Sequence, residues 1–464
     1  MFTSTRLDSI CHTLILTLAL LLAGCSATPI VINPPLGASN TPERLRTNSL
    51  PARADKLVED RTTVILAFSG GGTRAAALSY GVLQALRDTP LPSGGKRKRL
   101  LDEVDAISAV SGGSFTAAYY ALKGDGIFKD FEPNFLKRDL ESELKSTIFS
   151  LSHIFSRDSR SQQAMRVYDK RLFHGARFSD LTRPNAPVLV INASDLGQGV
   201  RFSYTQEYFD LICSDLSGLP LSHAVTASSA VPLVFSPVLL KNYQGCETKT
   251  ARSIDSLAAR TDAAEPIAQN LSLLQRYATR VNSRYLHLID GGVTDNLGLR
   301  ALYDLIAAHG GVESFWPRIG KPTPRRFVII SVDGMRSSDL KLDAQPEAPS
   351  LLQTVQAVTD MQMDRYSADT LSLVTESAKS WAKTWSRPGA PVELYFVHLH
   401  FRQLEDVRLR DALYLIPTAL TLPAEQVDDL VATGAKLLRD NPEFKRLLQD
   451  LGAKPPAANL TAKP

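Results

Sequence analysis

The chain reads Val104-Asp-Ala-Ile-Ser-Ala-Val-Ser-Gly-Gly113 where an apolar segment gives way to a helical one. The seven residues up to Val110 suit a buried parallel strand. Ser111 follows at once, and two glycines leave room for a sharp turn into the helix. Such a turn lifts the serine hydroxyl above the carboxyl end of the strand, which is the geometry of a nucleophile elbow. Ser111 is therefore a candidate nucleophile.

This elbow departs from the pattern G-x-S-x-G, because Ala109 stands at its first glycine. Alanine is the smallest replacement, so the turn can still form. On this motif alone, an ordinary serine in a strand-to-helix turn remains an alternative.

Strands and helices alternate around this turn. Besides the strand over 104–110, apolar runs predict strands over 63–68, 187–193, 285–289, 326–333 and 393–400. Helical spacing predicts helices between them, over 74–87, after Gly113 through Leu122, and over 164–173, 297–308 and 351–378. Alternation of this kind predicts an α/β fold with a mostly parallel central sheet and helices on both faces.

A glycine-rich motif, Phe68-Ser-Gly-Gly-Gly-Thr-Arg74, follows the first predicted strand. Glycines at 70–72 let backbone amides converge on one point, and the dipole of the next helix favours an anion there. The motif also matches a dinucleotide-binding fingerprint, Gly70-x-Gly72-x-x-Ala75. That fingerprint requires an acidic residue about 20 residues further on. Residues 90–99 contain none, so we favour an oxyanion hole.

A third motif, Leu288-Ile-Asp-Gly-Gly-Val-Thr-Asp-Asn296, ends an apolar strand with a carboxylate. The two glycines that follow Asp290 allow the backbone to bend around it. In isolation this motif could be a simple Asx-type turn.

Together the three motifs resemble those of the patatin-like phospholipase family. The resemblance extends from about residue 63 to residue 298, and residues 227–237 are similar to a fourth block of the family. The residues that match the family's motifs are Gly70, Gly71, Gly72 and Arg74 for the oxyanion loop, Ser111 for the nucleophile, and Asp290, Gly291 and Gly292 for the Asp-Gly-Gly motif.

The resemblance implies a patatin-like three-layer α/β/α fold and an acyl hydrolase that acts on phospholipids or other lipid esters. It implies a Ser111–Asp290 dyad without histidine, metal or other cofactor. Arg74 would either contact the substrate or support the oxyanion loop. The alanine at 109 is closer to the elbow of cytosolic phospholipases A, which leaves the substrate preference open.

Two other functions remain open. The first is a Ser-Asp-His α/β-hydrolase, in which Asp333 and either His398 or His400 would complete a triad with Ser111. The second is a lipid-binding lipoprotein that has no catalytic activity.

The N-terminal residues resemble a bacterial lipoprotein signal. The apolar run over 10–22 is shorter than the roughly 20 residues of a membrane-spanning helix and suits a signal peptide. It leads into Leu22-Ala-Gly-Cys25, which is similar to a lipobox. We expect residues 1–24 to be removed and Cys25 to carry a lipid anchor. Because Ser26 follows Cys25, we expect the outer membrane, with the body in the periplasm or at the cell surface.

The remaining chain divides by composition. We expect a flexible tether over 25–60, a catalytic domain over 61–336 with a possible insertion at 244–284, a mostly helical C-terminal region over 337–452 and a disordered tail over 453–464. Cys213 and Cys246 could pair in an oxidising compartment or remain free thiols. The 464 residues carry a net charge of only +4, so nucleic acid is not an expected partner, and no Cys/His cluster predicts a metal site. The sequence does not predict an oligomeric state.

Overall fold

The structure is a computed structural model of the chain. It describes residues 31–37, 48, 62–92, 98–148, 158–183, 186–243, 245–262, 266–279, 283–336, 346 and 348–455. The predicted signal peptide, Cys25, most of the predicted tether and residues 456–464 of the predicted tail lie outside these residues. Over the described ranges, no helix combines the length and the apolar character needed to cross a membrane.

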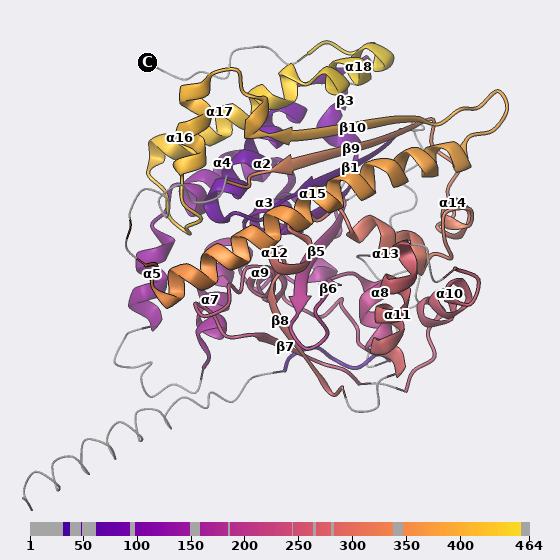
Figure 1. Cartoon of the computed structure of the whole chain (residues 1–464), viewed down its shortest axis with the longest axis horizontal. Coiled ribbons are helices and arrows are strands. Elements are labelled where there is room, and N and C mark those ends of the chain that lie inside the picture. Colours follow the sequence, from indigo (N-terminus) through magenta and orange to yellow (C-terminus); the bar gives the residue numbers. More distant parts are fainter. Residues whose placement is uncertain are drawn as a thin grey trace, which may run out of the picture.

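An eight-stranded sheet forms the centre of the molecule (Figure 1). Five neighbouring strands run parallel, and the last of them, β5 (Val188–Asp195), pairs antiparallel with both β8 (Tyr285–Asp290) and β6 (Val200–Ser203). The predicted mostly parallel sheet is therefore confirmed. In spatial order the strands are β10 (Glu393–His400), β9 (Arg326–Asp333), β1 (Thr62–Phe68), β4 (Val104–Val110), β5 (Val188–Asp195), β8 (Tyr285–Asp290) and β7 (Val238–Lys241), with β6 (Val200–Ser203) beside the end of β5.

Helices cover both faces of the sheet, because successive side chains of a strand point to opposite faces. In β1, Leu66 and Phe68 enter one apolar core, whereas Ile65 and Ala67 enter the other. The first core is completed by α2 (Gly72–Arg87), α3 (Gly112–Lys123) and α17 (Ala424–Asp440). The second is completed by α13 (Ala301–Ala308) and α15 (Leu351–Trp385). These layers confirm the predicted α/β/α architecture.

The other described elements lie around these layers. The helices are α4 (Ile127–Phe131), α5 (Leu140–Ile148), α7 (Arg160–Tyr168), α8 (Gln206–Leu211), α9 (Leu221–Ser228), α10 (Lys249–Ala258), α11 (Pro266–Thr279), α12 (Gly292–Asp295), α14 (Phe315–Arg318), α16 (Val407–Leu415) and α18 (Pro442–Leu451). The short 3-10 or π segments are η3 (Leu100–Glu103), η4 (Gly124–Gly126), η5 (Glu132–Leu136), η6 (Asp169–Phe173), η7 (Phe178–Asp180) and η8 (Phe401–Gln403), and β2 (Pro90–Leu91) pairs with β3 (Lys98–Arg99). The possible insertion at 244–284 contains α10 and α11, which pack against each other.

The predicted C-terminal region over 337–452 is mostly helical but is not a separate unit. Its strand β10 is hydrogen-bonded along its whole length to β9 of the predicted catalytic domain. Its helix α17 packs against α2, and Leu430 and Leu438 of α17 share a core with residues of β1. The C-terminal region is therefore continuous with the predicted catalytic domain, because β10 extends the sheet and α17 covers α2.

Two asparagines in the described part of the predicted tether over 25–60 are buried. The side chain of Asn33 accepts a hydrogen bond from the amide of Lys241 (2.9 Å) and donates one to its carbonyl (3.0 Å). Asn48 pairs in the same manner with Leu189, by accepting from its amide (3.0 Å) and donating to its carbonyl (2.6 Å). A carboxamide can complete a strand's backbone hydrogen bonds in this way, so parts of this segment pack against the body.

Cys213 and Cys246 form a disulfide across a sequence separation of 33, with their Cα atoms 5.7 Å apart. This is one of the two alternatives that the sequence left open. The N-terminal segment contacts the same loop, because the amide of Leu36 donates to the carbonyl of Cys213 (2.7 Å).

Candidate active site

Ser111 occupies a strained turn between β4 and α3. Its backbone has φ +47° and ψ −121°, a conformation that non-glycine residues rarely adopt and that is often kept at functional sites. Hydrogen bonds to other elements stabilise the turn. The amide of Ser111 donates to Ser228 Oγ (2.8 Å), and Ser228 Oγ donates to the carbonyl of Asn192 (2.6 Å). The predicted nucleophile elbow is present, and Ser228 supports it from the end of α9.

The elbow lies directly against the glycine-rich loop. A Cβ atom at Gly112 would stand 1.9 Å from the carbonyl oxygen of Gly72, so only glycine fits there. A Cβ atom at Gly70 would be 3.3 Å from Ser111 Cβ. Two motifs some forty residues apart in the sequence are therefore in backbone contact, as an oxyanion hole requires.

Asp290 is the hydrogen-bond partner of Ser111. The hydroxyl of Ser111 donates to Asp290 Oδ2 (2.8 Å), and the amide of Gly292 donates to Oδ1 (2.8 Å). Asp290 ends β8 opposite Ala193 of β5, and β5 is the neighbour of β4. Burial of the carboxyl raises the pKa of Asp290 from 3.8 to about 6, although both hydrogen bonds oppose this shift. The structure thus brings the two predicted residues into contact.

The predicted oxyanion hole needs one correction. The amide of Gly70 donates to the carbonyl of Asn296 (3.0 Å), so this amide holds the loop and is not available for an oxyanion. Gly71 and Gly72 have positive φ angles of 134° and 61°, and their amides have no acceptor within the described ranges. The amide of Gly112 opens α3 beside them, where first-turn amides lack a partner in the helix.

Gly112 was not among the predicted donors. In a nucleophile elbow the residue after the nucleophile supplies an oxyanion-hole amide, so the motif itself contains the signal. The candidate donors are therefore the amides of Gly71, Gly72 and Gly112.

Arg74 is only 2% exposed and points away from solvent. It donates to the carbonyl of Gly334 after β9 (2.7 Å), to the carbonyl of Ile416 (2.6 Å) and to Thr418 Oγ1 (3.1 Å). Burial, and the nearby charge of Arg336, lower its pKa to about 10. Of the two roles that the resemblance implies for Arg74, these contacts favour support of the glycine-rich loop.

The histidines of the alternative triad lie elsewhere. His398 and His400 are in β10, which is three strands from β4, or roughly 14 Å at about 4.8 Å per strand. His398 Nε2 lies 4.0 Å from Asp333. Burial lowers the pKa of both imidazoles to about 4. The group that contacts the Ser111 hydroxyl is the carboxylate of Asp290.

A buried arginine connects β4, the strand before Ser111, with α12, the helix after Asp290. Arg201 of β6 donates to Asn192 Oδ1 (3.2 Å), forms an ion pair with Asp304, and lies 3.5 Å from Asp295 at the end of α12. Asn192 in turn donates to the carbonyl of Ala109 in β4 (3.2 Å). Neither Arg201 nor Asn192 belongs to a recognisable motif, so no sequence pattern indicated these two residues.

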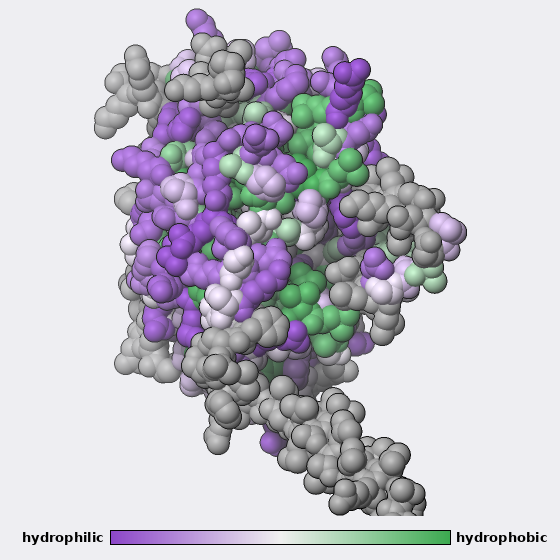
Figure 2. Space-filling model, turned by 90° about the vertical axis from the view of Figure 1, so that its left-hand side faces the viewer, coloured by the Kyte–Doolittle hydropathy of each residue, from purple (hydrophilic) through white to green (hydrophobic). Residues whose placement is uncertain are grey.

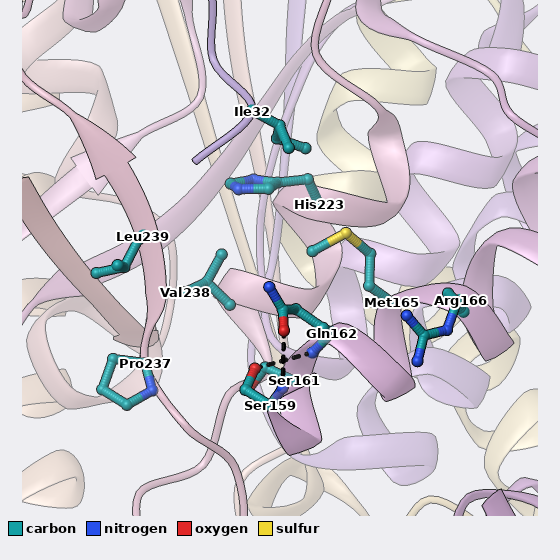
Figure 3. A pocket seen from close by; sticks show the side chains of 10 residues that line it. All are labelled: Ile32, Ser159, Ser161, Gln162, Met165, Arg166, His223, Pro237, Val238 and Leu239. Atoms are coloured by element: carbon teal, nitrogen blue, oxygen red, sulfur yellow. Dashed lines mark hydrogen bonds between the residues drawn. The ribbon is translucent and has the colours of Figure 1, made fainter. Parts of the chain in front are cut away.

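A pocket of ≈ 140 Å³ lies apart from this dyad, between α7, α9 and the start of β7 (Figure 3). His223, Met165 and Val238 are among its lining residues, and Gln162 beside them is hydrogen-bonded to Ser159. None of the predicted catalytic or oxyanion-hole residues lines this pocket. Nor do the described residues include a group of three or more His, Cys, Asp or Glu side chains placed to hold a metal ion.

Comparison with solved structures finds human GIVD cytosolic phospholipase A2. Against the structure of that protein by itself, the TM-score is 0.38 and the identity 13%, and the match covers 88% of this chain and 65% of that one. In complex with methyl gamma-linolenyl fluorophosphonate, the TM-score is 0.37, the identity 13% and the coverage 88% and 63%. The chain thus spans somewhat less than two thirds of these proteins. No curated protein sequence matches it significantly.

The family comparison covers the part of the chain that holds every catalytic motif described above. Residues 66–303 match the model of the patatin-like phospholipases, and this range is just over half of the chain. It begins in β1, before the glycine-rich loop, and ends in α13, beyond Asp290. The chain therefore belongs to the patatin-like phospholipase family.

Proposed function

We propose that this protein is a lipid acyl hydrolase that cleaves ester bonds of phospholipids or related lipids through a Ser111–Asp290 dyad. The observation that carries the proposal is the 2.8 Å hydrogen bond from the Ser111 hydroxyl to Asp290 Oδ2. It lies at a strained elbow and beside the amides of Gly71 and Gly72, which have no other acceptor in the described part of the chain.

The mechanism is a two-step acyl transfer. Ser111 Oγ attacks the ester carbonyl while its proton passes to Asp290. The amides of Gly71, Gly72 and Gly112 stabilise the tetrahedral oxyanion. Asp290 then gives the proton to the departing alcohol, which leaves an acyl-serine ester. Water attacks this ester while Asp290 takes its proton, the proton then passes to Ser111 Oγ as that oxygen leaves, and the carboxylic acid is released. A pKa of about 6 suits a base that works near neutral pH.

Replacement of the nucleophile tests the proposal. Ser111→Ala removes one oxygen and should lower turnover of a p-nitrophenyl acyl ester by at least ~10³-fold, with an unchanged circular dichroism spectrum. Retention of more than a few per cent of the activity would overturn the assignment of Ser111. Absence of turnover by the unaltered protein would contradict the proposed hydrolase and favour the non-catalytic lipid-binding alternative. If turnover is found, product analysis with mixed phospholipids identifies the bond that is cleaved.

We further propose that Cys25 carries a lipid that anchors the protein to the outer membrane, with the body in the periplasm or at the cell surface. The support is the Leu22-Ala-Gly-Cys25 sequence after an apolar run. The Cys25→Ser variant should remain unprocessed and should no longer be found in the outer-membrane fraction. Normal processing and membrane partition of this variant would show that the lipobox interpretation is wrong.

A further inference from the structure

Exposed apolar side chains are concentrated near the candidate active site. The described residues include twelve exposed large apolar side chains, and nine of them lie on four segments. One of the nine, Tyr366 of α15, has its ring covered by the guanidinium of Arg300. We call the other eight the apolar rim: Val231, Leu233 and Val234 after α9; Val293 in α12; Val358 and Met361 in α15; Val407 and Leu415 in α16. Single exposed apolar residues are normal, whereas a cluster of them indicates an interaction surface.

Two segments of the apolar rim are joined directly to Asp290. The amide of Asp290 donates to the carbonyl of Ala230 (3.0 Å), which immediately precedes Val231. Val293 belongs to α12, which begins two residues after Asp290.

The other two segments contact the loops beside the dyad. Helix α15 packs against α12, and a Cβ atom at Gly292 would be 3.0 Å from Met363 Sδ. Helix α16 leads into residues 416–420, which hold the glycine-rich loop: Ala419 accepts from the amide of Thr73 (2.9 Å) and Ile416 accepts from Arg74 (2.6 Å). All four segments thus surround the loops that form the dyad and the oxyanion hole.

The carboxyl ends of β9 and β10 point to the left of Figure 1, and Figure 2 shows the molecule from that side. This face is mostly polar, but apolar patches interrupt it.

Charges near the apolar rim are balanced. In and beside α16, Arg408 and Arg410 are accompanied by Asp406 and Asp411. Next to α15, Arg336 is paired with Asp360 at 3.2 Å. A surface with apolar side chains and little net charge suits a zwitterionic lipid surface better than an anionic one, because anionic lipids attract clustered cations.

We propose that the apolar rim docks on the surface of a zwitterionic phospholipid bilayer, so that a lipid can pass directly from the bilayer to Ser111. This inference rests on the proposed function, because it identifies the physical state in which the ester substrate is taken up. Docking of this kind is driven by burial of apolar area. It should therefore survive high salt, which screens exposed charges.

Turnover of two substrates tests the proposal. Leu233→Asp and Leu415→Asp replace side chains that are 58% and 61% exposed. Each should lower hydrolysis of phosphatidylcholine vesicles about tenfold and leave hydrolysis of a water-soluble p-nitrophenyl ester within about twofold. The matched control is Tyr285→Asp, which is 48% exposed but begins β8, about 17 Å along the strand from Asp290. It should have no effect. Equal losses in all three variants, or loss of vesicle turnover in 1 M salt, would overturn the inference.

A second measurement does not depend on activity. In the full chain, Leu233→Cys and Leu415→Cys would be labelled with an environment-sensitive fluorophore, with Tyr285→Cys as the control. The first two labels should shift to shorter wavelength on phosphatidylcholine vesicles, and the third should not. Shifts without any turnover would support the apolar rim while refuting the proposed hydrolase. Turnover without shifts would do the reverse.

Discussion

At the scale of single residues, the burial of Asp290 opposes the charge that its proposed role requires. In the proposed mechanism its carboxylate must be charged to accept the Ser111 proton, yet burial favours the neutral form and raises its pKa to about 6. Below that pH the base is protonated, so kcat/KM for a soluble ester should fall about tenfold per pH unit. A pH–rate profile from pH 4 to pH 8 measures this directly, and a profile that stays flat down to pH 4 would exclude Asp290 as the base.

The same pKa shift predicts that Asp290→Asn makes the protein more stable. Because the pKa is raised in the folded state, the stabilising contribution of Asp290 is fully present below its unfolded pKa and is lost as pH rises through about 6. At pH 8 the neutral amide should therefore raise the free energy of unfolding by up to about 3 kcal/mol, and at pH 3 by much less. Urea unfolding at both pH values measures the difference, while turnover should fall by roughly 10³–10⁴-fold. A variant that is inactive and less stable at pH 8 would contradict this account.

Histidine replacement separates the dyad from the alternative triad. His398 and His400 lie in β10, three strands from Ser111, so His398→Gln and His400→Gln should each keep turnover within about tenfold of the original. A dead variant with a native circular dichroism spectrum would favour the triad.

At the scale of elements, α9 positions the elbow through one hydroxyl. Ser228→Ala would leave the Ser111 amide and the Asn192 carbonyl without their partner, at a cost of about 1–3 kcal/mol in stability. It should also lower kcat about tenfold or more, since small displacements of a nucleophile are costly. The control is the adjacent Ser229→Ala, whose hydroxyl bonds to Val225 within α9 and whose loss should leave kcat unchanged. Equal kcat values for the two variants would exclude a positioning role for Ser228.

Elements with a strong local signal could be predicted, and elements defined by tertiary contacts could not. The apolar runs over 326–333 and 393–400 coincide with β9 and β10. The short strands β6 and β7 have four residues each and show no clear period. The helix predicted from residue 297 begins only at Ala301, because Gly298 has a φ of +68° and makes a turn first.

The same distinction holds within the site. Ser111 and Asp290 belong to motifs that combine a strand end with small residues, so the sequence identified both. The role of the Gly70 amide depends on a carbonyl at Asn296, more than 200 residues away. Arg201 depends on partners from three other elements, and no local pattern reports such contacts.

At the scale of the whole molecule, segments outside the family match complete the fold. Residues 66–303 carry the dyad, but β10 and α17 supply a sheet edge and the cover of α2. At the other end of the chain, Asn33 and Asn48 are buried against β7 and β5. Cys25 lies eight residues before Asn33, a distance of at most about 28 Å for an extended chain. A lipid on Cys25 would therefore hold the body within about 28 Å of the membrane, and a tether of this length does not fix which face docks.

Arg74 is the point where the C-terminal region reaches the oxyanion loop, and its replacement tests that connection. Lysine keeps the charge but lacks the planar fork that serves three acceptors at once. Arg74→Lys should therefore lower the free energy of unfolding by about 2 kcal/mol and lower kcat about tenfold as the glycine-rich loop loosens. The matched control is Arg87→Lys at the far end of α2, where the side chain pairs with Asp88 near solvent. It should change stability by no more than about 0.5 kcal/mol. Urea unfolding and turnover of a soluble ester measure both effects. If Arg74→Lys is less stable but has an unchanged kcat, the C-terminal region supports the fold without positioning the oxyanion hole.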